Sequence, residues 1–145
     1  MRAICVLTTL LLTTACSASL TAGGPDGSTH GISMVATVRS RTSIGDSVTI
    51  QITNVGTRLE FFSRCGSAPL LLVQQFVDNV WTGGVQNFMC VAPTAPGPVP
   101  LAPGESITLV RVLSVQGRFR FVTPVGEAED LSDATQTASN GVDIP

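Results

Sequence analysis

Alternation of apolar and polar residues with a period of two is the feature that most limits what this chain can fold into. In SVTIQITN, Val48, Ile50 and Ile52 share one face, and the polar residues between them share the other. The same alternation recurs in ISMVATV (32–38) and GRFRFVT (117–123). Side chains alternate across a β-strand, so each segment predicts a strand with one buried and one solvated face.

Turn signals divide the rest of the chain into further short strands. These are expected at 58–63, 70–77, 80–81, 85–90, 107–115 and 137–144. Asp78 and Asn79 fit a two-residue hairpin turn, because both residue types tolerate positive φ. The residues expected to face the core include Ile32, Met34, Ala36, Val38, Val48, Ile50, Ile52, Phe119, Phe121, Val142 and Ile144.

Composition agrees with a turn-rich all-β chain. Only 12% of the residues are charged, against about 25% in a typical soluble domain. The chain also has 14 glycines and 9 prolines, and no segment has convincing helical periodicity. The predicted fold is one immunoglobulin-like antiparallel β-sandwich of about seven or eight strands, spanning residues 31–145.

The first fifteen residues, MRAICVLTTLLLTTA, follow the order of an export signal. Arg2 supplies a positive charge, an apolar segment covers 3–12, and small residues follow. At about 1.5 Å per residue, a helix of that segment covers roughly half the hydrocarbon core of a bilayer. Residues 1–15 are therefore expected to be a signal peptide rather than a transmembrane anchor.

The sequence LTTAC at residues 12–16 resembles the lipobox of bacterial lipoproteins, although Thr13 stands where that family usually has leucine. The resemblance implies cleavage before Cys16, diacylation of its sulfur and anchoring in a membrane. It also implies sorting to the outer membrane, because Ser17 is not the aspartate that signals inner-membrane retention. The alternative is ordinary secretion with cleavage after Ser17 or Ser19, where small residues also occupy the recognised positions.

Residues 16–30 are expected to be a flexible tether between the lipid and the domain. The segment ASLTAGGPDGSTH is rich in Gly, Ser and Thr and has no apolar periodicity. Without Arg2, seven basic and ten acidic residues leave a net charge of −3. That charge provides no electrostatic footprint for nucleic acid and no polybasic patch for a membrane surface. Membrane attachment is therefore expected through the lipid on Cys16.

Two cysteines remain after Cys5 is assigned to the leader and Cys16 to the lipid site. Cys65 and Cys90 form an even pair in an exported protein, which predicts a disulfide. The alternative is a Cu(I) site whose candidate ligands are Cys65, Met89, Cys90, Met34 and His30. No metal-binding spacing supports that alternative, so we expect no metal and no cofactor.

No catalytic constellation is expected, and the chain is predicted not to be an enzyme. The single histidine, His30, ends the tether without a nucleophile beside it, and no nucleophile elbow, phosphate loop or zinc motif occurs. The acidic residues of GEAEDLSD are Glu127, Glu129, Asp130 and Asp133. Their spacing is not that of a calcium loop, and we interpret the segment as a solvated acidic loop.

Pieces of the segment 47–122 resemble the immunoglobulin-like domains of bacterial envelope proteins, including the BsuPI-type proteinase-inhibitor domain. The pieces are VTIQITNVG, Trp81, LAPGESITL and GRFRF, which stands where such domains usually have a Gly-x-Tyr-Arg strand. The resemblance implies the sandwich fold. It transfers no inhibitory activity, because no reactive-loop motif is matched, and the chain has no tyrosine to form a tyrosine corner.

These features favour a non-enzymatic, membrane-anchored lipoprotein that presents a binding or structural module in the cell envelope. Its expected partner is an envelope protein or a glycan. The expected contact regions are the loop 64–69 with Arg64, the turn 78–84 with Asp78, Asn79 and Trp81, and the proline strip APTAPGPVPLAP at 92–103. The alternative interpretations are a Trp81 packed over the core or the disulfide and a proline strip that only crosses between sheets. The alternative functions are a secreted or periplasmic protease inhibitor and a copper-handling protein.

Overall fold

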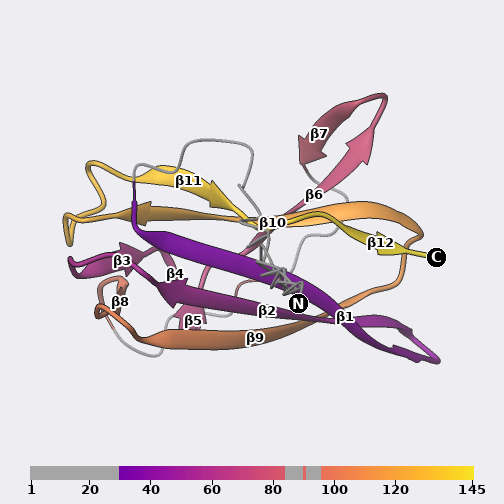
Figure 1. Cartoon of the computed structure of the whole chain (residues 1–145), viewed down its shortest axis with the longest axis horizontal. Helices are drawn as coiled ribbons and strands as arrows, with labels where there is room; N and C mark the ends of the chain where they lie inside the picture. Colours follow the sequence, from indigo (N-terminus) through magenta and orange to yellow (C-terminus); the bar gives the residue numbers. More distant parts are fainter. Residues whose placement is uncertain (1–29, 84–89, 91–95) are drawn as a thin grey trace, which may run out of the picture.

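The computed structural model describes residues 30–83, 90 and 96–145, and this part of the chain is all-β, as predicted. Two antiparallel sheets pack against each other around one hydrophobic core (Figure 1). Across the described ranges, no helix has the length and hydropathy needed to cross a membrane.

The smaller sheet has the strand order β1–β2–β9. Its strands are β1 (Ile32–Thr42), β2 (Gly45–Asn54) and β9 (Ser106–Leu113). The central strand β2 pairs along most of its length with both neighbours, so Ile50 lies between Ala36 and Leu109. This sheet contributes the apolar row that the alternation in SVTIQITN predicts.

The larger sheet is built around β10 and has the path β7–β6–β10–β3–β8, with β11 and β12 also paired to β10. Its strands are β3 (Glu60–Phe62), β6 (Leu72–Val77), β7 (Val80–Gly83), β8 (Val99–Leu101), β10 (Gly117–Gly126), β11 (Thr135–Ala138) and β12 (Val142–Ile144). A separate small pair consists of β4 (Arg64–Cys65) and β5 (Ala68–Pro69). β11 and β12 pair with successive parts of β10, on the edge opposite β6, and Figure 1 shows them near the two ends of β10 in the upper layer.

The core consists of the residues that alternate inward from both sheets. Val48, Ile50 and Ile52 are fully buried, and Phe119 and Phe121 face them from β10, so both predicted alternations are confirmed. Val38 is an exception, because it is 37% exposed although the alternation predicts it in the core. A bulge between Val38 and Ser40 shifts the register of β1, and the strand continues beyond the core from there.

The number of strands differs from the prediction of seven or eight, since the described residues form twelve. The region after β2 is divided into the short strands β3, β4 and β5, and the last predicted strand is divided into β11 and β12. Short polar turns leave the apolar–polar alternation of the sequence intact, so the sequence does not reveal where one short strand ends and the next begins. Of the strand expected at 85–90, residues 85–89 lie outside the described residues.

The hairpin between β6 and β7 has the predicted turn. Asp78 and Asn79 have φ angles of 50° and 65°, and Val77 pairs with Val80 across them. Two consecutive positive φ angles match the right-handed twist of the flanking strands. Figure 1 shows this hairpin extending away from the two layers.

The predicted disulfide between Cys65 and Cys90 is present, with the two Cα atoms 5.1 Å apart. It closes a loop with a sequence separation of 25 residues, which includes the whole β6–β7 hairpin. The bridge thus ties the end of β4 to the segment that follows the hairpin.

We predict that replacing both cysteines with serine, in the double variant C65S/C90S, lowers the free energy of unfolding by about 3–4 kcal/mol. The reason is that the bridge restricts the unfolded chain over a loop of this length. Urea unfolding measures the difference. Reductant should lower the stability of the unchanged protein by a similar amount and leave the double variant unaffected. An equal response of both proteins to reductant would contradict the prediction.

Candidate functional site

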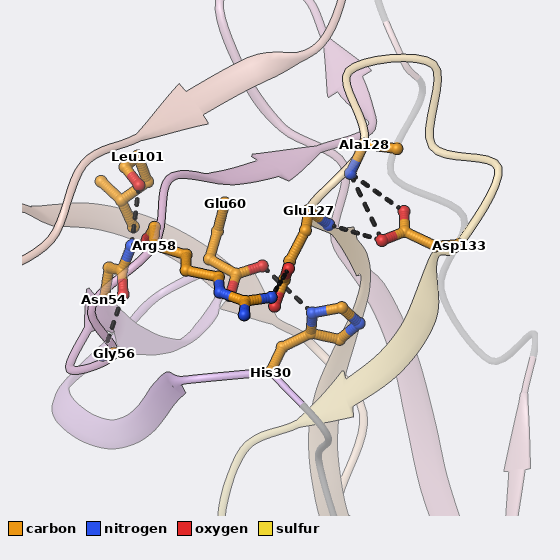
Figure 2. A network of polar contacts seen from close by, with 9 residues as sticks. All are labelled: His30, Asn54, Gly56, Arg58, Glu60, Leu101, Glu127, Ala128 and Asp133. Carbon is orange, nitrogen blue, oxygen red and sulfur yellow. Dashed lines mark hydrogen bonds and ion pairs between the residues drawn. The ribbon is translucent and has the colours of Figure 1, made fainter.

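A layer of polar side chains closes one end of the sandwich, at the left of Figure 1, where β1 begins and β10 ends. We call His30, Glu60 and Glu127 the polar end layer. Figure 2 shows the His30 ring and the two carboxylates turned toward one another. The three residues come from three separate segments of the chain, and the fold alone brings them together.

The alternation of each strand explains why these polar side chains point inward. His30 lies two residues before the buried Ile32, and Glu60 lies two residues before the buried Phe62. Glu127 follows the buried Val125 by two residues. Residues i and i+2 of a strand share a face, so Glu60 lies on the core-facing side of β3 with Phe62. His30 and Glu127 lie just beyond the ends of β1 and β10, next to the same end of the core.

Strand pairing places the two glutamates next to each other. Phe62 of β3 pairs with Val125 of β10, and Phe61 pairs with Gly126. One further step in this antiparallel register brings Glu60 opposite Glu127. Two like charges in opposite positions on one sheet face repel each other, so this arrangement needs positive charge close by.

A close contact between two glycines brings His30 to the same place. A Cβ atom on Gly31 would collide with the backbone of Gly56, in the turn that follows β2. The Gly31 carbonyl accepts hydrogen bonds from the amides of Val55 and Gly56 at 2.8 and 2.9 Å. The missing side chains let the start of β1 lie directly on this turn, which sets His30 against Glu60.

His30 and Glu60 form a buried contact. His30 Nδ1 lies 3.1 Å from Glu60 Oε2, and the two side chains are only 7% and 2% exposed. One ligand atom from each of His30, Glu60 and Glu127 falls within 4.8 Å of the other two. The polar end layer is therefore a compact set of one imidazole and two carboxylates.

Burial and charge act in opposite directions on Glu60. Burial raises the pKa of the Glu60 carboxyl, and the nearby negative charge of Glu127 raises it further. The charge of His30 and a hydrogen bond from the Gly31 amide lower the pKa of Glu60, but burial is the largest effect. The ionised form of Glu60 is therefore stabilised by very few groups, and His30 is the main one.

Arg58 balances the second carboxylate from the solvent side. Its Nη1 pairs with Glu127 Oε2, and this contact raises the pKa of the Arg58 guanidinium. The Arg58 side chain is 72% exposed, and that of Glu127 is 35% exposed. Solvent screens an exposed ion pair of this kind and leaves it little net stability, so Arg58 can leave Glu127 at little cost.

Asn54 holds the surrounding turns in place from within. Its Nδ2 donates hydrogen bonds to the carbonyls of Arg58 and Leu101, at 2.7 and 2.8 Å. Its Oδ1 accepts a hydrogen bond from the Gly56 amide at 3.0 Å, and the residue is fully buried. One amide side chain thus fixes the turn that carries Arg58 and the strand β8 beside it.

The acidic segment after β10 is only partly the solvated loop that we expected. Glu129 and Asp130 are exposed, whereas Glu127 belongs to the polar end layer. The Asp133 carboxylate accepts hydrogen bonds from the amides of Glu127 and Ala128, at 2.9 and 3.1 Å. These bonds lower the pKa of Asp133, and the bond from the Ala128 amide has the largest effect. They also curl the loop so that Glu127 faces inward (Figure 2).

The residues proposed from the sequence as binding contacts lie elsewhere. Arg64 donates hydrogen bonds from Nε to the Gly97 carbonyl and from Nη2 to the Pro98 carbonyl, both at 2.8 Å. Arg64 thus holds the described end of the proline strip against β4. Asp78 and Asn79 form the exposed turn of the β6–β7 hairpin.

Trp81 is half-buried in β7, the edge strand of the larger sheet, where it pairs with Phe76 one step from the turn. Its ring centre lies 5.0 Å from that of Phe76, and the guanidinium of Arg120 lies over it at 4.6 Å. The candidate lipid site, Cys16, lies outside the described residues. Both thiols of the copper alternative, Cys65 and Cys90, are joined in the disulfide, so neither is available as a thiolate ligand.

The sequence pattern places His30 at the end of the expected tether, and Glu60 carries no motif that marks it as a site residue. The signal that identifies the polar end layer is the period of two itself, extended by one step beyond Ile32, Phe62 and Val125. What the sequence does not contain is the pairing of β3 with β10, which lie far apart in the chain.

We predict that Asn54→Ala lowers the free energy of unfolding by about 2–4 kcal/mol, because buried carbonyl and amide groups lose their partner. Asn54→Asp should be at least as harmful, since a carboxylate cannot donate to the two carbonyls. The matched control is Thr53→Ala on the exposed face, with an expected loss of about 0.5 kcal/mol. Urea unfolding compares the three variants, and equal losses for Thr53→Ala and Asn54→Ala would contradict the role given to Asn54.

Comparison with known proteins adds no assignment. A scan against models of protein families finds no match for this chain, and a search of curated proteins finds no similar sequence.

Proposed function

We propose that this chain is a lipoprotein of the bacterial cell envelope, anchored through Cys16, that presents an immunoglobulin-like β-sandwich as a non-enzymatic binding module. The observation that carries the proposal is the Cys65–Cys90 disulfide in an all-β domain, in a chain whose LTTAC segment at 12–16 resembles a lipobox. Disulfides persist mainly in oxidising compartments, so this bridge supports export.

The β6–β7 hairpin supports a binding role and gives it a location. Val77 and Val80 are exposed on either side of the turn, and Trp81 follows Val80 in β7. Exposed apolar residues on a projecting hairpin, next to a tryptophan and an arginine, have the composition of a protein contact surface. Since the guanidinium of Arg120 already covers the Trp81 ring, a protein partner is favoured over a stacked sugar.

The anchor is tested by replacing Cys16 with serine. We predict that Cys16→Ser moves the protein from the membrane fraction to the soluble fraction of the cells, because serine cannot receive the thioether-linked diacylglycerol. Intact mass of the unchanged protein should show a chain that begins at Cys16 and carries lipid. The matched control is Cys5→Ser, which alters only the leader and should change neither location nor mature mass. A mature chain that begins after Ser17 or Ser19 would contradict the anchor.

The binding surface is tested with a photo-crosslinking amino acid placed at Val80 in living cells. We predict one discrete crosslinked envelope protein, because this side chain is 59% exposed on the proposed contact surface. Ile44, which is 70% exposed on the separate β1–β2 hairpin, is the control position and should give no such product. Absence of a product at Val80, or the same product at both positions, would overturn the assignment of the hairpin.

A further inference from the structure

We propose that the polar end layer is a binding site for a divalent transition-metal cation of the Zn²⁺ type, with His30, Glu60 and Glu127 as protein ligands. This inference does not depend on lipidation or on a partner of the β6–β7 hairpin. The ion would join the start of β1 to β3 and to the end of β10, at the point where the tether enters the domain.

The spacing of the ligand atoms supports a metal. Zn²⁺ binds imidazole nitrogen and carboxylate oxygen at about 2.0–2.2 Å, so two tetrahedral ligands are about 3.3–3.6 Å apart. His30 Nδ1 and Glu60 Oε2 are 3.1 Å apart, and the Glu60 oxygen has no partner with hydrogen-bond geometry. Glu127 lies within 4.8 Å of both and is partly exposed, so a rotation of its side chain completes the set.

The charge of the site also favours a cation. Glu60 is buried with Glu127 beside it, and a buried carboxylate is costly unless positive charge compensates it. Asp133, whose carboxylate faces the Glu127 amide, adds negative charge to the same end of the domain. Arg58 is the permanently charged cation that faces these acids in the described part of the chain, and its side chain is mostly in solvent.

The type of ligand atom selects the class of ion. Ca²⁺ and Mg²⁺ prefer sites made of oxygen atoms, whereas an imidazole with two carboxylates suits Zn²⁺ and neighbouring transition metals. Three protein ligands leave a fourth tetrahedral position for water. The surrounding turns are held by Asn54 and Asp133, which gives the ligands a rigid support.

Arg58 makes the inference distinguishable from a simple ion-pair cluster. Its guanidinium occupies Glu127 Oε2, the same carboxylate that the metal needs, so Arg58 competes with the ion. Removing Arg58 should therefore strengthen metal binding. In an ion-pair cluster that binds no metal, the same substitution only removes one exposed contact.

The test uses the purified mature protein after removal of metals with a chelator. Calorimetric titration with Zn²⁺ should give one site per chain, and Zn²⁺ should raise the melting temperature, because an ion that binds only the folded state stabilises it. Ca²⁺ and Mg²⁺ should have neither effect. Failure of Zn²⁺ to bind, or an equal effect of Ca²⁺, would overturn the proposal.

Variants assign the site to these residues. His30→Asn and Glu127→Gln should each weaken Zn²⁺ binding roughly tenfold or more, while Arg58→Gln should tighten it severalfold. Glu129→Gln, which removes the same charge from an exposed position in the same loop, should bind as the unchanged protein does. Circular dichroism checks folding, and Glu127→Gln serves where His30→Asn does not fold. Zn²⁺ binding that both ligand variants retain, or that Arg58→Gln leaves unchanged, would refute the proposal.

Discussion

The contact between the backbones of Gly31 and Gly56 determines how the chain enters its domain. Because neither residue has a side chain, the segment before β1 lies directly on the turn after β2, and two amides of that turn bond to the Gly31 carbonyl. His30 is then directed between the sheets rather than into solvent. This contact places the histidine beside Glu60 and Glu127, which the register of β3 against β10 brings together.

The polar end layer shows how a sandwich can end without exposing its core. The rows of apolar side chains stop at Ile32, Phe62 and Val125, and the next inward position on each strand carries a polar group. These groups separate the core from solvent, and their charges must compensate one another because burial removes much of their hydration. Because β3 has only three residues, Glu60 lies near the surface of the domain. Its side chain nevertheless remains covered.

Much of the fold could be predicted from local pattern, because a half-buried strand records its own burial in alternate residues. Ile50 in β2 and Phe119 in β10 are examples, and the Asp78–Asn79 turn is another, since its residue types are suited to its φ angles. Val38 could not be placed correctly, because a bulge changes the register without changing the alternation.

The candidate site depends on pairing between distant segments, which no local pattern contains. Glu60 and Glu127 become neighbours only through the register of β3 against β10. Glu60 follows a turn and precedes two phenylalanines, and taken alone it resembles any charged residue at the start of a strand. His30 follows a polar segment, so composition assigned it to the tether. The cysteine pair is easier to identify, because only two cysteines remain once Cys5 is assigned to the leader and Cys16 to the lipid site.

The position of β10 has a consequence for the order of folding. This strand pairs with β3 and β6, which precede it in the chain, and with β11 and β12, which follow it. Until β10 is present, the larger sheet has no centre, and the β1–β2 and β6–β7 hairpins are the main local units that can form. Such long-range pairing has a high contact order, which slows folding because large loops must close before the contacts form. During synthesis from the N-terminus, the larger sheet therefore cannot be completed before β10 has emerged.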